Sequence, residues 1–525
     1  MRREFGRRFL SVLDTPWPLL AVVVLALGLR LVNLAGRPLW YDEAFAVLYA
    51  EKPFETMLYG TVAQVEGAAA DVHPLFFYSL LHLWMSLVGQ SPAAVRALSV
   101  LIGTGTVGVV YLLARRLYDR RIGLAAAALA AVAPFAVYYS QEARMYALLA
   151  LVATAAAYFL VRAWTGGRWY EWAAFGLCGA MTLYAHNLGF AFIASLDLWL
   201  AWRWLRGGGD RLRPLTCIIW SHLLMLALFA PWLAIVPSQF GKIQQAYWVQ
   251  QPGLLEAIQT AVIFHFGYDN QALPAWLTPV ALLFSLLILA AVALELVRHR
   301  RHLSPHLLPA LLAFVPPVLL GSLSLIRPVY IVRALLPSAL AYYVLVAGTL
   351  GARTVPRAIR WGLLLAAAVV TLFSLANHYT YEQFPRTPFD RLAAFLHEHH
   401  EPGDAIVHSN KLTFLPTHYY DRTLPQAFVG DEPGSPSDTL AYPTQQALGL
   451  FAAPGIEAAA AGSRRVLWVV FRREIDEYVQ AGFSEHPQLA WLREHYTAGA
   501  ITPFGDGELH EFRSAASSPA TGEAP

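Results

Sequence analysis

The sequence predicts a mainly α-helical membrane protein, in which a polytopic bundle of transmembrane helices is followed by a small extracytoplasmic α/β domain. Of its 525 residues, 57% are hydrophobic and 14% are charged, whereas soluble globular proteins carry about 25% charged residues. Uncharged runs such as 277–294 and 363–375 approach the length that crosses a bilayer core. The composition then becomes more polar after residue 376. Together these observations predict a transmembrane domain over 1–376 and a soluble domain over 377–513.

The apolar segments predict about 11–13 spans. Arginines precede the first segment, as in a signal peptide, but no small-residue cleavage pattern follows it, so we expect an uncleaved first helix. The segments lie at 17–34, 75–89, 93–116, 122–138, 145–163, 170–185, 188–205, 215–235, 276–297, 306–326, 334–351 and 359–376.

Clusters of arginine between these segments predict the cytoplasmic side, because positive charge is retained there. The loops 36–74 and 239–274 and the C-terminal domain are then outside. One conflict remains. If the arginine clusters on both sides are assigned correctly, the two segments 75–89 and 93–116 together must cross the membrane only once. Either one of them is partial or re-entrant, or one arginine cluster breaks the rule.

The two outside loops, 36–74 and 239–274, are long and rich in aromatic residues, which predicts functional segments at the membrane interface. In the first loop, Phe45, Leu48, Tyr49 and Phe54 are expected to form an interfacial helix face.

The soluble domain is predicted from an amphipathic run at 389–399 and two apolar strands at 405–407 and 466–471. It has no cysteine and no glycine-rich phosphate loop, so we expect neither a disulfide nor a nucleotide site there. The tail, 514–525, is expected to be disordered. The net charge of +3 argues against a nucleic-acid partner.

The first candidate for chemistry is Asp42 with Glu43, adjacent carboxylates that follow Tyr41 in the first outside loop. Such a pair suits a general base and its electrostatic partner. The alternative is structural, with Asp42 capping a helix and Glu43 in its first turn. Both interpretations can hold for the same residue.

Further polar residues lie at the outer ends of apolar segments. His73 precedes a proline, and Glu142 and Arg144 are framed by tyrosines that include Tyr146. Arg144 suits a lipid phosphate, but a structural pairing of Glu142 with Arg144 is the alternative.

Five other polar residues are candidates for the site. His186 and Asn187 occupy an outer turn, and Asp197 lies near the middle of its span, where a carboxylate needs a partner, a proton or water. Arg327 and Arg333 flank a short outside turn, which favours an anion-binding role over simple snorkelling.

Several short motifs resemble, in their order and spacing, those of a known family, the bacterial branch of the dolichyl-phosphate-mannose-protein mannosyltransferases. These are type C (GT-C) polytopic glycosyltransferases and are related to the lipid A aminoarabinose transferases. The resemblance spans roughly residues 17–350. It is carried by RPLWYDEAF at 37–45, VHPLFFY at 72–78, AVRALS at 94–99, LLARRLY at 112–118, YSQEARMY at 139–146, YAHN at 184–187 and VRALLP at 332–337.

The resemblance implies an inverting transferase that uses a polyprenyl-phosphate sugar at the outer face of the membrane. It makes Asp42 the base for the acceptor hydroxyl, with Glu43 beside it, and His73, Arg144 and Arg333 the ligands of the donor phosphate. The aminoarabinose branch has a lysine where this chain has His73 and an acid near Arg144, which puts that substrate in question. Some relatives use a divalent metal, but no clear ligand cluster is present, so no metal is assigned.

The leading hypothesis is therefore a multi-pass protein of the bacterial inner or plasma membrane that transfers one sugar from a polyprenyl-phosphate donor. The acceptor is a lipid, a glycan or a protein. The alternative is a transporter or flippase of lipid-linked saccharides, in which Asp197 lines a path. A third possibility is a polymerase or ligase of lipid-linked oligosaccharides. Apart from Asp197 and His82, few polar residues lie at mid-span, which favours an enzyme.

Overall fold

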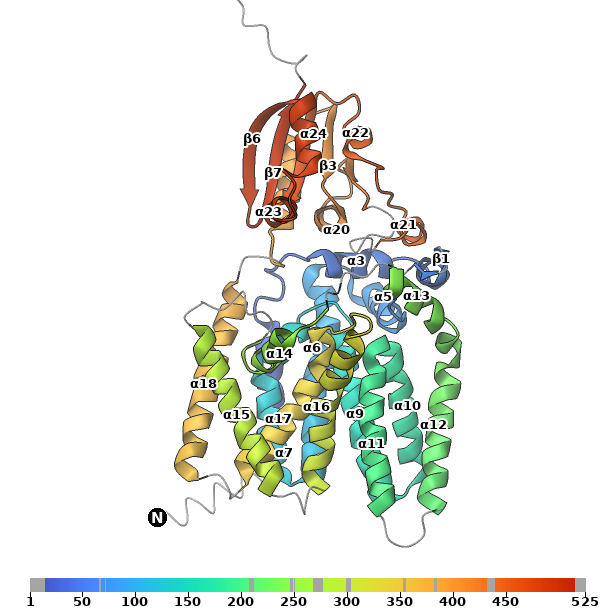
Figure 1. The fold of residues 1–525 in the computed structure, drawn as a ribbon, viewed down its shortest axis with the longest axis vertical. Coiled ribbons are helices and arrows are strands. Elements are labelled where there is room, and N and C mark those ends of the chain that lie inside the picture. The colour runs from blue at the N-terminus through green and yellow to red at the C-terminus, as the bar shows by residue number, and fades with distance from the viewer. Residues whose placement is uncertain are drawn as a thin grey trace, which may run out of the picture.

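The computed structural model describes residues 15–65, 68–70, 72–206, 212–245, 249, 251–267, 277–298, 304–352, 356–381, 385–431 and 440–514. The predicted disordered tail lies almost wholly outside these residues. A helical bundle forms one part of the molecule and a smaller α/β domain forms the other (Figure 1). We call the end of the bundle that faces this domain the head end.

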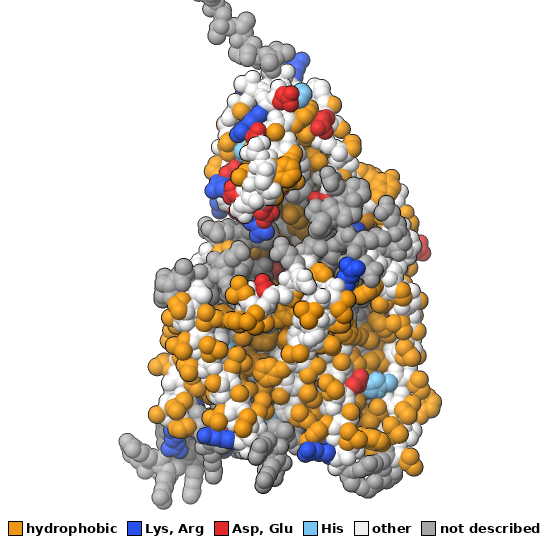
Figure 2. Space-filling view, in the orientation of Figure 1, with side chains coloured by type: hydrophobic (Ala, Val, Ile, Leu, Met, Phe, Trp, Pro, Cys, Tyr) orange, Lys and Arg blue, Asp and Glu red, His pale blue; other side chains and the backbone are white. Residues whose placement is uncertain are grey.

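The bundle confirms the predicted polytopic fold class. Within the described residues, eight helices are long and apolar enough to cross a membrane, or nine if one bent pair counts as a span. Hydrophobic side chains cover its surface, and Lys and Arg gather at the end opposite the head end (Figure 2). The bundle helices are α2 (Trp17–Leu31), α6 (Pro92–Leu117), α7 (Arg120–Val132), α9 (Tyr146–Gly166), α10 (Trp169–Ala185), α11 (Phe190–Arg206), α12 (Leu212–Leu233), α15 (Thr278–Arg298), α16 (Ser304–Ser324), α17 (Leu336–Gly351) and α18 (Arg357–Thr380).

Of the two predicted segments 75–89 and 93–116, the segment 75–89 is the one too short to be a full membrane span. It forms α5 (Phe76–Val88), whose 13 residues extend for about 20 Å, short of the ~30 Å of a bilayer core. This helix lies at the head end beside α3 (Tyr41–Ala50), whereas α6 runs through the bundle (Figure 1). The two segments therefore cross once.

A break in one bundle helix creates the turn that carries Glu142 and Arg144. Helix α7 ends before Pro134, and α8 (Pro134–Ser140) continues at an angle of 61°. Buried Arg30 donates to the carbonyls of Ala130 and Ala131 at 3.2 and 2.9 Å. These bonds satisfy carbonyl groups at the helix end that proline leaves without an amide partner.

The head end is covered by short elements. They are α3, α4 (Phe54–Val62), the strands β1 (Gln64–Val65) and β2 (Ala68–Ala69), η1 (Asn187–Gly189), α13 (Val236–Gln245), α14 (Leu254–Phe266) and η4 (Val332–Leu335). The prediction of an interfacial face on α3 is wrong, because Phe45, Leu48 and Tyr49 are buried. They are buried because α3 packs between the bundle and the C-terminal domain.

The C-terminal domain contains a five-stranded sheet of order β4-β3-β5-β7-β6. Strand β3 (Asp404–His408) pairs in parallel with β4 (Gln426–Phe428) and β5 (Arg465–Phe471), and β7 (Gly507–Arg513) is antiparallel to β5 and β6 (Thr497–Phe504). The helices are α19 (Phe389–His399), α20 (Lys411–Tyr420), α21 (Tyr442–Leu448), α22 (Ile456–Ala459), α23 (Arg472–Gln480) and α24 (Pro487–His495). The α/β class agrees with the prediction, although only β3 and β5 were predicted.

The domain sits on the head end through polar contacts as well as packing. Helix α20 packs on α3, and α21 packs on α4. The Leu39 amide donates to the Tyr420 hydroxyl at 2.8 Å, and Thr444 Oγ1 donates to the Gly60 carbonyl at 2.9 Å. The domain therefore touches the segment that leads into Asp42.

Candidate active site

Asp42 lies in the first turn of α3 and is held between two arginines from distant parts of the chain. Arg333 Nη1 donates to Asp42 Oδ2 at 2.9 Å, and Arg144 Nε lies 3.9 Å from the same oxygen. The side chain of Asp42 keeps 14% of its surface exposed. Trp40, not Asp42, occupies the N-cap position of α3, so Asp42 is a first-turn acid rather than a cap.

The charge of Asp42 is set by two opposing effects. Burial by itself raises the pKa of this carboxyl, but the attraction of Arg144, Arg333 and His73 outweighs burial and lowers the pKa below its ordinary value of 3.8. Asp42 is thus a carboxylate while both arginines are beside it. Removing their charge, or neutralising it with an anion, would make Asp42 a stronger base.

Glu43 is adjacent to Asp42 in sequence, but its side chain points to a different partner. It is fully buried, and its two carboxylate oxygens accept from Arg96 Nε and Nη2 at 2.8 and 2.6 Å. The Ala143 amide donates to it at 3.0 Å. Burial raises the pKa of Glu43, but Arg96 and the Ala143 bond outweigh burial, and the net shift is downward. Glu43 therefore ties α3 to α6 and to the turn after α8.

Arg96 also fixes the chain that leads into α3. Its guanidinium donates to the carbonyls of Leu34, Arg37 and Pro38 at 3.0, 2.6 and 2.9 Å. Sequence reasoning did not include Arg96 among the site residues, although a charged residue inside a long apolar helix was a usable signal.

Aromatic rings surround the two arginines beside Asp42. The Arg333 guanidinium lies over the Tyr146 ring at 5.4 Å and over Trp40 at 6.0 Å. Arg144 Nη1 donates to the Tyr78 hydroxyl at 3.2 Å. Tyr78 was likewise missed, because a tyrosine in an apolar run carries no distinct sequence signal.

Two histidines, His73 and His186, belong to the same group of residues around Asp42. The His73 and His186 rings make an edge contact at 5.8 Å, and His186 lies 6.1 Å from the Tyr146 ring. Burial, followed by the charges of His73, Arg333 and Arg144, lowers the pKa of His186 well below its usual value. A neutral His186 accepts from the Leu188 amide at 3.1 Å, and its buried Nε2 has no hydrogen-bond partner within the described chain.

Glu142 is buried near Asp42 and does not form an ion pair with Arg144. Its Oε2 is buried and has no hydrogen-bond partner among the described residues. Burial, reinforced by the charge of Glu43, raises the pKa of Glu142 to about 7. Glu142 is therefore the carboxyl of this group that changes charge near neutral pH.

We expect Glu142→Gln to be more stable than the wild type at pH 8 and equally stable at pH 4.5. The folded state keeps the Glu142 proton up to about pH 7, whereas the unfolded chain releases it near its ordinary pKa. Wild-type stability therefore falls as pH rises through this window, by on the order of 3 kcal/mol. Thermal unfolding of both proteins at the two pH values measures the difference. A pH-independent difference would contradict this assignment.

The remaining predicted residues lie outside this group. Tyr41 stacks on Phe45 at 6.4 Å. Asn187 bonds the Val72 carbonyl, Gln239 and Trp232, so it connects the ends of three segments. Asp197 finds a partner in His222, at 2.9 Å, between α11 and α12. Arg327 is exposed at the end of α16.

No group of three or more His, Cys, Asp or Glu side chains with metal-ligand spacing occurs in the described residues. Two carboxylates, Asp42 and Glu142, are close to one another, but Asp42 is paired with arginine.

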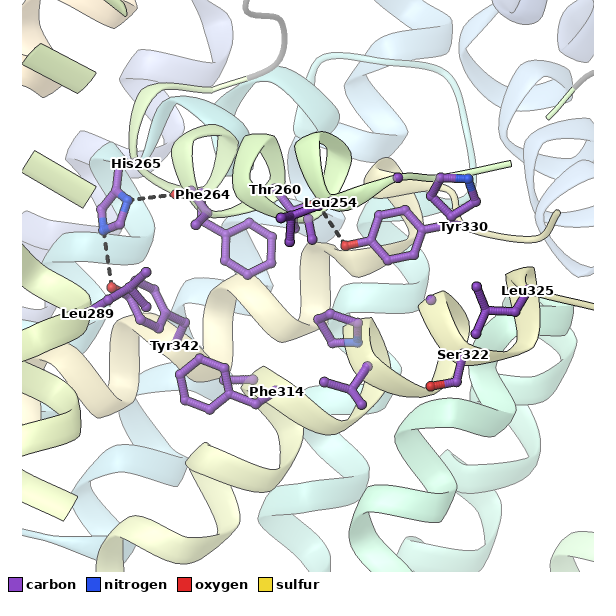
Figure 3. Close-up of a pocket in the computed structure, with 18 residues that line it drawn as sticks. Leu254, Thr260, Phe264, His265, Leu289, Phe314, Ser322, Leu325, Tyr330 and Tyr342 are labelled. Carbon is purple, nitrogen blue, oxygen red and sulfur yellow. Dashed lines mark hydrogen bonds between the residues drawn. The ribbon is translucent and has the colours of Figure 1, made fainter. Parts of the chain in front are cut away.

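An apolar cavity of about 700 Å³ lies between α14, α16 and α17. Its walls include Phe264, Leu289, Phe314 and Leu325 (Figure 3). Tyr330, which bonds Thr260 at 2.8 Å, also lines it and precedes η4, the element that carries Arg333.

Comparison with solved structures identifies the class of protein: a polytopic membrane protein with the GT-C glycosyltransferase fold. ArnT from Cupriavidus metallidurans, bound to undecaprenyl phosphate, superposes with a TM-score of 0.61 at 15% identity, covering 96% of this chain and 100% of ArnT. The oligosaccharyltransferase AglB from Archaeoglobus fulgidus, with an inhibitory peptide and dolichol-phosphate, gives 0.53 at 14% identity, covering 96% of this chain and 75% of AglB.

The arabinofuranosyltransferase AftD from Mycobacteria gives a TM-score of 0.50 at 13% identity, covering 95% of this chain and 40% of AftD. At the level of sequence, residues 72–235 match the profile of the dolichyl-phosphate-mannose-protein mannosyltransferase family. The resemblance predicted from the motifs is therefore confirmed. No curated protein matches the sequence significantly.

Proposed function

We propose that this protein is an inverting glycosyltransferase that moves a sugar from a polyprenyl-phosphate donor to an extracytoplasmic acceptor. One observation carries this proposal: a partly exposed carboxylate, Asp42, is held between Arg144 and Arg333, and an apolar cavity is lined by Tyr330, close to Arg333 in the sequence. A base, a phosphate clamp and a lipid groove are the parts that such a transfer needs.

The reaction develops charge at two places. The acceptor hydroxyl loses a proton as it attacks the anomeric carbon, and the bond from that carbon to the phosphate oxygen breaks. Asp42 accepts the proton, and the bonding electrons leave with the polyprenyl phosphate. Arg144 and Arg333 then stabilise the phosphate anion where its charge increases. Because a phosphate is a good leaving group, one base and a pair of guanidinium groups suffice.

The ion pair between Asp42 and Arg333 couples donor binding to the strength of the base. A donor phosphate competes with Asp42 for the two guanidinium groups, which prefer bidentate oxyanions. Once the phosphate takes them, their effect on the pKa of Asp42 weakens. Asp42 becomes a better proton acceptor only when a donor is bound.

The apolar cavity suits the prenyl tail of the donor. The tail would lie against Phe264, Phe314 and Leu325, and the phosphate would reach Arg333 past Tyr330. The head end then corresponds to the extracytoplasmic face, because most Lys and Arg side chains visible on the surface of the bundle lie at the opposite end (Figure 2).

Filling this cavity should weaken the binding of long donors selectively. A Cβ at Gly321 meets only the Tyr330 ring, at 3.9 Å, so Gly321→Leu places its side chain in the cavity without a clash. We expect KM to rise roughly tenfold for a donor with a long prenyl chain and to change little for a two-isoprene donor. Gly362→Leu, on exposed α18, where a Cβ meets nothing within 4 Å, is the matched control. Equal KM values for both donors would exclude the cavity as the tail site.

The proposal is tested by supplying the purified protein with radiolabelled sugars on synthetic polyprenyl phosphates and with an extract of bacterial envelope acceptors. Release of polyprenyl phosphate together with labelled acceptor supports transfer. If no donor is consumed but vesicles containing the protein move lipid-linked sugar across the bilayer, the protein is a transporter instead. The pair of Asp197 with His222 would then be the first residues to test on the transport path.

A further inference from the structure

A second pair of buried arginines lies at the head end, apart from the pair that holds Asp42. Arg37, in the segment before α3, donates to Gln141 Oε1 at 2.5 Å and lies 3.2 Å from His378 Nε2, and its Nε is buried without a hydrogen-bond partner within the described chain. Arg386 follows α18. It is 6% exposed and lies over the Tyr138 ring at 5.2 Å.

The two guanidinium groups belong to one cluster, because the Tyr138 ring also contacts the His378 ring, with their centroids 5.2 Å apart. We call Arg37, Arg386, His378 and Tyr138 the Arg386 cluster. Among the described residues, Arg386 has neither a hydrogen bond nor an ion pair. Burial, with the like charges of Arg386 and Arg96, lowers the pKa of Arg37 well below its usual value. Arginine stays protonated in proteins, so the cluster holds two buried guanidinium charges.

The carboxylates nearby do not neutralise the cluster. Glu43 is bound by Arg96, and Asp42 is bound by Arg333. Glu142 makes no ion pair with either arginine of the cluster. A buried charge without a counter-charge is costly, so two buried arginines that make no ion pair among the described residues indicate a site completed by an anion.

We propose that the Arg386 cluster is a second anion-binding site, which takes a phosphate group presented from the membrane surface. The planar forks of two arginines suit phosphate oxygens. Access from the membrane follows from α18, which exposes Trp361, Leu365 and Leu372 to lipid and carries the half-buried His378 in its last turn. The phosphate belongs either to the acceptor or to a phospholipid that does not react, and only the first source rests on the proposed function.

The site is tested by the affinity of the full-length protein, in neutral detergent micelles, for a fluorescent phosphatidic acid. We expect Arg386→Gln to weaken binding at least tenfold, Arg386→Lys to retain part of it, and Arg37→Gln to reproduce the loss. Arg391→Gln, an exposed arginine on α19, removes the same charge and should bind as the wild type. Wild-type affinity in folded Arg386→Gln and Arg37→Gln would overturn the proposal.

A second measurement separates this site from the donor site. Polyprenyl phosphate should bind Arg386→Gln as tightly as the wild type, whereas Arg333→Gln should lose it. Failure of polyprenyl phosphate to bind the wild type would contradict the proposed function and leave the phosphatidic acid result standing.

Transfer kinetics, measured with a total envelope extract, identify which molecule carries the phosphate that binds the Arg386 cluster. An Arg386→Gln variant with raised KM for acceptor and unchanged KM for donor identifies the acceptor as the carrier. Loss of stimulation by added phosphatidic acid, with both KM values unchanged, identifies a bystander lipid. A variant that matches the wild type in both respects contradicts a role for the site in transfer.

Discussion

Asp42→Asn should depress sugar transfer by about 10²–10⁴-fold, the usual contribution of a general base, without weakening donor binding, because the neutral amide competes less with the donor phosphate for the two arginines. The amide keeps the size of the side chain and can still accept from Arg333, but it cannot take the acceptor proton. The measurement is the single-turnover rate of labelled-sugar transfer, with polyprenyl phosphate binding measured in parallel.

Asp390→Asn is the matched control for this experiment. Asp390 is exposed on α19, so the same loss of charge occurs far from Asp42 and the transfer rate should not change. A folded Asp42→Asn protein that transfers sugar at the wild-type rate would show that another group is the base. Glu142 would then be the next residue to test, because its pKa of about 7 suits proton transfer at neutral pH.

Arg96→Met should destabilise the protein by about 3–5 kcal/mol, the usual cost of leaving a buried ion-pair partner alone. Both side chains of the Arg96–Glu43 pair are fully buried, with a closest distance of 2.6 Å. The substitution also removes the bonds to the carbonyls before α3, so transfer should fall because Asp42 is no longer held in place. The midpoint of thermal unfolding in detergent measures the first effect.

Two comparisons make this prediction specific. Arg422→Met breaks an ion pair with Glu51 in which the arginine is half exposed, and such pairs contribute only about 0–1 kcal/mol. The double variant Arg96→Met with Glu43→Gln should recover part of the lost stability, because no charge is left unpaired. If Arg96→Met unfolds at the same temperature as Arg422→Met, the Arg96–Glu43 pair does not hold α3.

The fold class was predictable because a bilayer imposes a strong, local rule on sequence. Long uncharged segments and the polar C-terminal region were enough to predict a helical bundle with an α/β domain. The strands β6 and β7 escaped prediction because their residues are not a continuous apolar run, and the burial of β6 is low along most of its length.

The number of membrane crossings that follow the first outside loop could be decided only from the structure. From the sequence, either one of the segments 75–89 and 93–116 was partial or re-entrant, or one arginine cluster broke the positive-inside rule. Packing shows that 75–89 is the partial segment, because α5 lies beside α3 at the head end, while α6 runs through the bundle. Hydropathy could not distinguish them, because a short amphipathic helix on the head end is as apolar as a span.

The sequence alone determined which polar residues are unusual for a membrane protein, and so selected Asp42, Glu142, Arg144 and Arg333 as candidates. It could not assign their partners. Arg333 meets Asp42 across 291 positions, and Asp42 and Glu43 take different partners because successive residues of a helix point about 100° apart. Only the tertiary structure brought Arg37 and Arg386 together, since contacts between distant segments depend on how helices pack rather than on any local pattern.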